Sequence, residues 1–275
     1  MSIGYLVPRV VRHFLPEWLT RFLLLRSVVI KPGLETVSPK AAAARYVGVL
    51  EERNTPLLGK RVLVLGYGGR FDIGVELLDA GAAHVTLSDR YAKPDDVHNR
   101  QLVHAHPGYL CLVDGHPRPR AERLELIQAD IREAHEAATS EPYDLILSSS
   151  VFEHLDDAGA ITQALAAQTA RDGLHIHFVD LRDHFFRYPF EMLRFSESTW
   201  RRWLNPTSNL NRLRLWEYRR IFEMEFGVVE IEVLERDELS FHKVRRHARP
   251  EYMSGDPLAD AATLIRIVAL EPRYP

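Results

Sequence analysis

A short apolar run that ends in a glycine-rich turn constrains this chain more than any other feature. Residues 61–66, RVLVLG, are almost uniformly apolar, as is typical of a strand buried on both faces of a sheet. The turn Gly66-Tyr67-Gly68-Gly69 follows at once, and residues 71–82 then carry the apolar spacing of a helix. This order predicts the first unit of a parallel sheet whose faces are covered by helices.

The same alternation continues along the chain. Further strands are predicted at 84–89, 124–130, 143–150, 174–181, 228–235 and 264–272. Helices are predicted at 95–104 and 157–171, whereas the prolines and glycines of 107–120 predict a loop. We therefore expect an α/β fold with a doubly wound sheet and right-handed crossovers.

The composition excludes several classes of protein. With 275 residues, a hydrophobic fraction of 46% and a net charge of −3, the chain is not disordered and lacks the basic excess of a nucleic-acid binder. Its single cysteine, Cys111, excludes an internal disulfide and a thiolate zinc site, and favours a cytoplasmic location. We expect a small-molecule partner and no nucleic acid.

The most apolar stretch lies near the N-terminus, at residues 14–30. It contains Glu17 and Arg26, so it is too charged to span a bilayer, and no cleavage site of a secretory signal follows it. Its spacing predicts an amphipathic helix. We expect residues 1–58 to form an N-terminal helical cap on a main domain at 59–275. The helix would pack on that domain or in a homodimer interface, with peripheral membrane contact as the alternative.

Glycines and acidic residues stand at the carboxyl ends of the first three predicted strands. Gly66, Gly68 and Gly69 lack side chains, so their backbone amides can approach a polar ligand. Asp89 ends the second strand, where an acid accepts hydrogen bonds from ribose hydroxyls. Asp130 ends the third strand and could accept from an exocyclic amine. This pattern predicts a site for a ligand that contains adenosine. The third glycine of the dinucleotide-binding motif G-x-G-x-x-G is missing from the turn.

These motifs resemble those of the class I S-adenosylmethionine-dependent methyltransferases. VLVLGYGGRF is similar to their first motif, Asp89 to their ribose-binding acid, and LILSSSVFEHL to a later strand and turn. The last two predicted strands resemble their sixth and antiparallel seventh strands. The resemblance covers residues 59–182 and 228–271. It implies a seven-stranded Rossmann-like sheet and S-adenosylmethionine as the cofactor.

The chain departs from the family pattern at two positions. Leu65 stands where many members carry a polar residue, and the third glycine is shifted forward to Gly69, next to Arg70. Contacts to the methionine part of the cofactor are therefore expected from Tyr67 and Arg70. The other cofactor contacts that the resemblance implies are Ile131 and Ser149, beside the glycines and acids named above.

Carboxylates and histidines follow the fourth and fifth predicted strands. Methyl transfer to an alcohol requires removal of the hydroxyl proton, so a base or a metal is expected there. We expect His154, helped by Asp180, to be that base, with His184 as a second candidate. Glu153, Asp180 and Asp183 could instead gather Mg²⁺ through hard oxygen ligands. Helix capping and hydrogen bonding to backbone amides are the structural alternatives for these side chains.

The segment 183–226 breaks the alternation, and we expect it to be an acceptor-binding insertion after the fifth strand. Trp200 and Trp203 lie three apart on a predicted helix, so they are expected to share a face that stacks on a sugar ring or packs in the core. Further candidates for acceptor contacts are the hydrogen-bond donors Asn209, Asn211 and Arg212. Helix capping is the alternative for the asparagines.

Several motifs together indicate the class of acceptor. GKRVLVLGYGGRF, VDLRDHF and NLNRLR resemble a bacterial group of methyltransferases encoded beside polysaccharide-assembly genes, which implies a sugar acceptor. We therefore expect O-methylation of a saccharide or polysaccharide precursor. A small-molecule O- or N-methyltransferase of a biosynthetic cluster and a non-catalytic adenosine-ligand module are the alternatives. His175 and His177, which alternate in the fifth predicted strand, are expected to be buried and satisfied by their neighbours.

Overall fold

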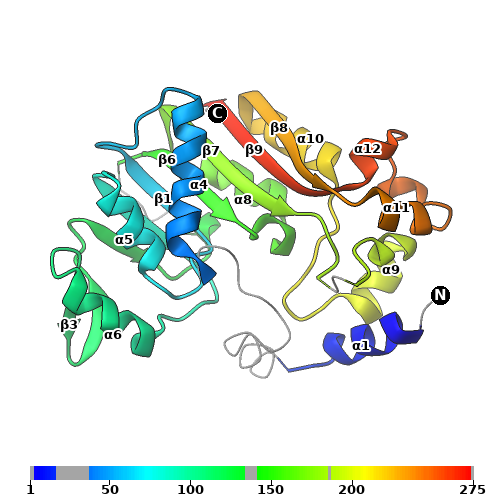
Figure 1. The fold of residues 1–275 in the computed structure, drawn as a ribbon, viewed down its shortest axis with the longest axis horizontal. Helices are drawn as coiled ribbons and strands as arrows, with labels where there is room; N and C mark the ends of the chain where they lie inside the picture. The colour runs from blue at the N-terminus through cyan, green and yellow to red at the C-terminus, as the bar shows by residue number, and fades with distance from the viewer. Residues whose placement is uncertain (1–2, 17–36, 134–140, 185–186, 274–275) are drawn as a thin grey trace.

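A computed structural model of the chain describes residues 3–16, 37–133, 141–184 and 187–273. Its strands are β1 (Arg61–Leu65), β2 (His84–Ser88), β3 (Leu110–Val113), β4 (His116–Pro119), β5 (Leu124–Ile127), β6 (Tyr143–Ser149), β7 (Thr169–Asp180), β8 (Phe226–Arg236) and β9 (Ala262–Pro272). Seven of them form one sheet in the order β5-β2-β1-β6-β7-β9-β8 (Figure 1). The first five of these are parallel, and β9 is antiparallel to both of its neighbours. The expected doubly wound α/β sheet is confirmed.

Helices connect these strands and cover the sheet. The longer ones are α1 (Ile3–His13), α4 (Pro39–Glu52), α5 (Asp72–Asp79), α6 (Asp96–Ala105), α8 (Ala158–Ala166), α10 (Leu215–Glu225) and α11 (Glu238–Val244). The shorter turns are η1 (Phe152–His154), η2 (Glu191–Arg194), α9 (Glu197–Thr199), η3 (Trp200–Leu204), η4 (Pro250–Tyr252) and α12 (Pro257–Asp260). Among the helices of the described residues, none combines the length and the apolarity that crossing a bilayer requires.

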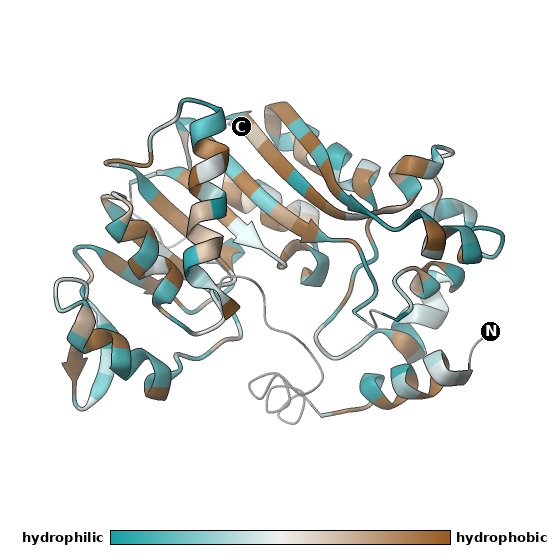
Figure 2. Cartoon of the chain, viewed as in Figure 1, coloured by the Kyte–Doolittle hydropathy of each residue, from teal (hydrophilic) through white to brown (hydrophobic). Residues whose placement is uncertain are grey.

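The central strands are apolar on both faces because each face packs against helices. Val62 and Val64 of β1 point into a core shared with α4 and α5. Leu63 and Leu65 point to the opposite face, into a core shared with α8 and α10. Figure 2 shows the resulting hydrophobic colour along the middle of the sheet. This two-sided burial explains the uninterrupted apolar run in the sequence.

A third hydrophobic core lies beside the sheet. We call it the accessory core; its fully buried members are Phe190, Met192, Leu193, Trp200, Leu204, Leu210, Phe241, Val244, Tyr252 and Ala261. Leu6 and Val10 of α1 pack against it. It therefore joins the first helix of the chain, the segment after β7 and the segment between β8 and β9, which lie together in Figure 1.

Three local predictions differ from the structure. The predicted loop at 107–120 contains the β3–β4 hairpin, whose two-residue turn is Asp114-Gly115. Both turn residues have positive φ, at 51° and 76°, as a type I′ turn requires. The third strand ends at Ile127, so Asp130 lies in the turn that follows it. The helix expected at 157–171 ends at Ala166, because the chain enters β7 already at Thr169.

The predicted N-terminal cap divides between two cores. In α4, Ala43, Tyr46 and Leu50 are buried in the core of the sheet. In contrast, α1 packs against η3 and the accessory core. Most of the apolar stretch 14–30 lies outside the described residues, and so does its predicted helix.

Candidate active site

The glycine turn after β1 is shaped by close contacts. Gly66, Gly68 and Gly69 all have positive φ, between 71° and 88°, where other residues are strained. A Cβ atom on Gly66 would lie 2.2 Å from the side chain of Val151, and one on Gly69 would lie 2.3 Å from the Lys93 carbonyl. Glycine is therefore required here by the protein's own packing, and Gly68 stays exposed at the end of the sheet.

Two side chains hold this turn from neighbouring elements. Asp89, directly after β2, accepts a hydrogen bond from the Gly68 amide at 3.3 Å, and its other oxygen accepts from the amides of Tyr91 and Ala92. Asn99 of α6, which the sequence analysis did not single out, donates to the Gly69 carbonyl and accepts from the Phe71 amide, both at 3.0 Å. The turn is thus fixed before any ligand binds. The helical position of Asn99 gave no signal of this role.

The remaining expected cofactor residues lie around this turn in different environments. The Tyr67 side chain is buried against Phe71, which leaves its backbone for contacts. Ile131 is buried in the α8 and α10 face of the core, and Ser149 is the last residue of β6.

Asp130 is engaged by two arginines. Arg132 binds it through two guanidinium nitrogens, at 2.9 and 2.6 Å, and Arg90 adds a third bond at 2.7 Å. The hydrogen bonds from Arg132 hold the pKa of Asp130 below its ordinary value. An exocyclic amine of the ligand would have to share the Asp130 carboxylate with Arg90 and Arg132. These two arginine partners were not predicted from the sequence.

The turn η1, after β6, carries Glu153 and His154 and is clamped by two asparagines. The Asn209 side chain donates to the carbonyls of His154 and Leu155, each at 3.0 Å. The Asn211 side chain donates to the Phe152 carbonyl at 2.7 Å, and the backbone N–H of Asn211 donates to the Glu153 carbonyl. Asn209 and Asn211 were expected to contact the acceptor. The structure shows them positioning the turn that carries His154.

The protonation state of His154 follows from its hydrogen bonds. Its Nδ1 lies 2.7 Å from the Asn209 carbonyl and 3.1 Å from that of Ser208. Carbonyl oxygens only accept hydrogen bonds, so Nδ1 carries the proton and Nε2 has a lone pair. Burial lowers the pKa of His154. The side chain is therefore a neutral imidazole with a fixed tautomer, and its acceptor nitrogen Nε2 has no donor within the described part of the chain.

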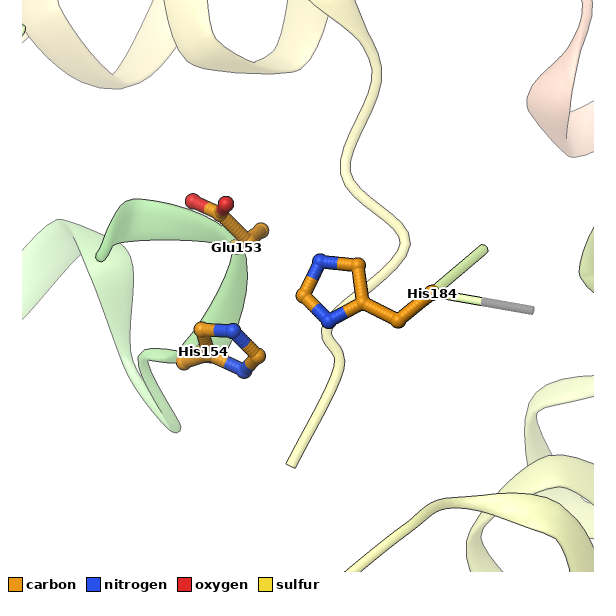
Figure 3. Close-up of side chains that lie close together, drawn as sticks. All are labelled: Glu153, His154 and His184. Carbon is orange, nitrogen blue, oxygen red and sulfur yellow. The ribbon is translucent and has the colours of Figure 1, made fainter. Parts of the chain in front are cut away.

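His184 lies against His154, with 4.8 Å between the ring centroids. Burial and the charges of nearby groups lower the pKa of His184 well below its ordinary value, so both rings are neutral near pH 7. Among the side chains that the structure describes, Glu153, His154 and His184 are the group of three whose metal-ligating atoms lie within 4.8 Å of one another (Figure 3). Two imidazoles and a carboxylate suit a divalent transition metal, and the same atoms suit proton transfer.

The predicted magnesium ligands Glu153, Asp180 and Asp183 are not brought together as a set. Asp180 is bound by Arg182 through two guanidinium nitrogens. Asp183 is fully buried and accepts from the Arg9 guanidinium and the Tyr5 hydroxyl. The carboxylate oxygens of Asp180 and Asp183 thus accept hydrogen bonds from arginines and are not arranged with Glu153 as ligands of one metal ion. Asp180 also does not orient His154 by a hydrogen bond, because backbone carbonyls take that place.

The other expected acceptor residues differ in exposure. Trp200 is 1% exposed and its indole donates to the Leu210 carbonyl, whereas Trp203 is 46% exposed, so the two rings do not share a face. The π-helical geometry of η3 replaces the regular spacing on which that prediction depended. Arg212 is buried over the Trp200 ring and donates to the carbonyls of Met192 and Phe195. It supports the accessory core.

One face of α1 brings to the site side chains that were not predicted from the sequence. Tyr5 and Arg9 hold Asp183, and the charge of Arg12 contributes to the lowered pKa values of both His154 and His184. A period of three to four residues in α1 was the available signal, since Tyr5, Arg9 and Arg12 occupy one helical face.

The histidines of β7 form a buried chain, as expected. Thr169 donates to the Leu165 carbonyl, so its oxygen accepts from His175 Nε2 at 2.7 Å. His175 Nδ1 then accepts from His177 Nε2 at 3.1 Å, and His177 Nδ1 accepts from the Ser148 hydroxyl at 2.8 Å. Each donor has one acceptor, and both histidines are neutral. Burial lowers the pKa of His177 to about 3 and that of His175 well below its ordinary value.

Comparison with known proteins identifies the fold. No protein-family model and no curated protein sequence matches the chain. Among solved structures, Haemonchus contortus phosphoethanolamine N-methyltransferase 2, in complex with phosphomonomethylethanolamine and S-adenosylhomocysteine, is similar with a TM-score of 0.50 and 13% identity. The match covers 84% of this chain and 53% of that one.

A second similar structure is a Nostoc punctiforme protein assigned as an O-methyltransferase, with a TM-score of 0.50 and 17% identity. Here the match covers 86% of this chain and 57% of the other. The chain thus spans little more than half the length of each. Together with the strand order and the antiparallel β9, these similarities show that the chain has the Rossmann-like fold of the class I methyltransferases.

Proposed function

We propose that the protein is an S-adenosylmethionine-dependent O-methyltransferase that acts on a hydroxyl of a saccharide or polysaccharide precursor. The observation that carries this proposal is His154, a neutral imidazole in a turn at the carboxyl end of β6, whose Nε2 lone pair accepts no hydrogen bond from the described residues. In parallel sheets this is the edge at which ligands bind.

The residues at that edge fit the cofactor that the fold implies. The exposed backbone of Gly68 and the partly exposed carboxylate of Asp89 lie beside each other at the ends of β1 and β2. Backbone amides there suit the polar groups of the ligand, and the carboxylate suits the two ribose hydroxyls. When bound, S-adenosylmethionine supplies an electrophilic methyl group on a sulfonium. Gly66, Gly68, Gly69 and Asp89 would hold it.

The chain's own contribution to the reaction is to remove a proton. As the acceptor oxygen bonded to the methyl carbon and the bond from that carbon to sulfur broke, the hydroxyl proton would pass to Nε2 of His154. The Asn209 carbonyl keeps Nδ1 protonated, so Nε2 is always the receiving atom. The negative charge of Asp180 raises the pKa of His154 slightly against the effect of burial, and so favours the imidazolium that forms. General bases of this kind contribute about 10²–10⁴-fold to a rate.

The choice of a hydroxyl acceptor follows from this base. An amine is nucleophilic once neutral and needs little beyond positioning, whereas an alcohol must lose its proton. The saccharide is supported by the resemblance of the VDLRDHF and NLNRLR motifs to the polysaccharide-associated group. The small-molecule O- or N-methyltransferase stays the alternative.

Binding and turnover test the proposal separately. We expect calorimetry to show binding of S-adenosylhomocysteine to the wild type and equal binding to His154→Ala. Transfer of a tritiated methyl group to a panel of glycosides, phenols and amines should favour glycosides and fall at least 100-fold in His154→Ala. His104→Ala, at an exposed position on α6, is the matched control and should keep full turnover. Binding of a nicotinamide dinucleotide in place of S-adenosylhomocysteine would refute the proposal, as would unchanged turnover in His154→Ala.

A further inference from the structure

Arg12, in the last turn of α1, is a buried cation, and two of its three guanidinium nitrogens meet no acceptor among the described residues. The residue is 4% exposed. Its Nε and Nη2 atoms are buried, and within the described part of the chain neither has an acceptor. A buried guanidinium normally has its donors satisfied, because losing water without gaining a partner is costly. Because residues 3–16, 37–133, 141–184 and 187–273 offer these two nitrogens no acceptor, they are placed for a further acceptor group.

The charged groups of the described residues around Arg12 do not balance its positive charge. The acidic group whose charge acts on Arg12 is Asp183, and both oxygens of Asp183 already accept from Arg9 and Tyr5. Burial, and after it the positive charge of Arg9, lowers the pKa of Arg12 to about 10. The carbonyl end of α1 favours a cation at this position, but it does not satisfy the buried nitrogens.

The position of Arg12 places this charge beside the proposed base. Its positive charge is among the causes that lower the pKa values of His154 and His184, after the larger effect of burial. Its carbonyl accepts from the Thr207 hydroxyl, and His13 contacts the Asn205 carbonyl at 2.6 Å. The last turn of α1 is thus fastened to the same segment whose Asn209 carbonyl orients His154.

We propose that Arg12 binds an anionic group of the methyl acceptor, a phosphate or a carboxylate. The proposal rests on the function proposed above and narrows its substrate to a charged saccharide. The forked donors of a guanidinium match two oxygens of either anion, and binding in a buried place strengthens the contact. The acceptor's charge would then fix its orientation, while His154 takes the proton from a neighbouring hydroxyl.

Calorimetry on protein loaded with S-adenosylhomocysteine tests this proposal, with three sugars as probes: glucose 1-phosphate, glucuronate and glucose. We expect at least one charged sugar to bind ten-fold or more tightly than glucose, and the stronger of the two identifies the anion. Arg12→Gln should erase that preference. Arg219→Gln, on the surface of α10 and paired with Glu223 of the same helix, should keep it.

Two results in this assay would overturn the proposal. One is an equal preference for the charged sugars in Arg12→Gln and the wild type. The other is a ten-fold loss of S-adenosylhomocysteine affinity in Arg12→Gln, which would assign the arginine to the carboxylate of the cofactor. If the wild type bound no S-adenosylhomocysteine but showed an Arg12-dependent preference for a charged sugar, the proposed function would fail and the anion site would stand.

Thermal unfolding without ligand separates an anion site from a structural role. Because the buried charge is unpaired, its removal in Arg12→Gln should leave the melting temperature unchanged or raise it, and a charged sugar should raise it in the wild type alone. A fall of several degrees in Arg12→Gln, with Arg219→Gln unchanged, would show that Arg12 supports the fold, contrary to the proposal.

Discussion

The buried histidine chain of β7 should make the protein sensitive to mild acid. His175 and His177 are fully buried and neutral, and each nitrogen of the pair has a partner in a chain that runs from Ser148 to Thr169. Protonating Nδ1 of His175 would place its proton against the N–H of His177, and a charge on either ring would be buried without a counter-charge among the residues that the structure describes. In the unfolded chain the same histidines take up a proton near pH 6.5.

The size of the effect follows from the two pKa values of His177. Its pKa is about 3 in the folded protein and 6.5 in the unfolded chain. Between these values the unfolded state binds more protons, so stability is fully present above pH 6.5 and is lost as the pH falls. From pH 7.5 to 5.0 the loss is about 2 kcal/mol for His177 alone. His175, with its lowered pKa, acts in the same direction.

Urea unfolding at pH 7.5 and 5.0 measures this loss. In His177→Gln the amide can still donate to His175 and its carbonyl can accept from Ser148, but nothing titrates at this position. We expect the variant to lose about 2 kcal/mol less than the wild type over this pH interval, whatever its stability at pH 7.5. His104→Gln, at an exposed site, is the control and should behave as the wild type. Equal losses in His177→Gln and the wild type would refute the reasoning.

Three further predictions concern the site. In Gly69→Ala the new Cβ would lie 2.3 Å from the Lys93 carbonyl, at a residue whose φ is +88°. We expect this variant to bind S-adenosylhomocysteine at least ten-fold more weakly by calorimetry, whereas Gly108→Ala, whose Cβ would have nothing within 4 Å, should bind it as the wild type does. Equal affinities of the two variants would contradict the proposed cofactor turn. Asn209→Gly tolerates the φ of +53° but loses the side-chain hydrogen bonds that hold the turn of His154, so methyl transfer should fall. Asn209→Ala loses the same bonds and also strains the backbone, so it should be about 1 kcal/mol less stable than Asn209→Gly in urea unfolding. Methyl transfer should persist in EDTA if His154 acts as a base, and its loss with recovery on Mn²⁺ or Zn²⁺ would make Glu153, His154 and His184 metal ligands.

The sheet could be predicted from sequence because its signals are local. An apolar run such as 61–66 belongs to a strand covered on both faces, and the glycine turn after it needs backbone angles that other residues avoid. The hairpin at 110–119 also had a local signal, since Asp114-Gly115 is a favoured two-residue turn. The prolines beside it concealed that signal in the sequence analysis.

The interior of the site depended on contacts that no local pattern carries. Asn209 and Asn211 have side chains suited to hydroxyl recognition, but their partners are backbone carbonyls of a turn more than fifty residues earlier. Asp183 belongs to a motif that suggested a metal, yet Arg9 and Tyr5 satisfy it from the other end of the chain. Which of several possible partners a polar side chain meets is decided by tertiary packing.

The position of α1 has a consequence for the order in which the protein assembles. The helix leaves the ribosome before its partners, because Asp183 is made 174 residues after Arg9, and Tyr252 of the accessory core later still. With eleven residues and an internal proline at Pro8, α1 is too short to be stable alone in water. This helix must therefore fold after the later segments that it contacts, onto a surface that they have already formed.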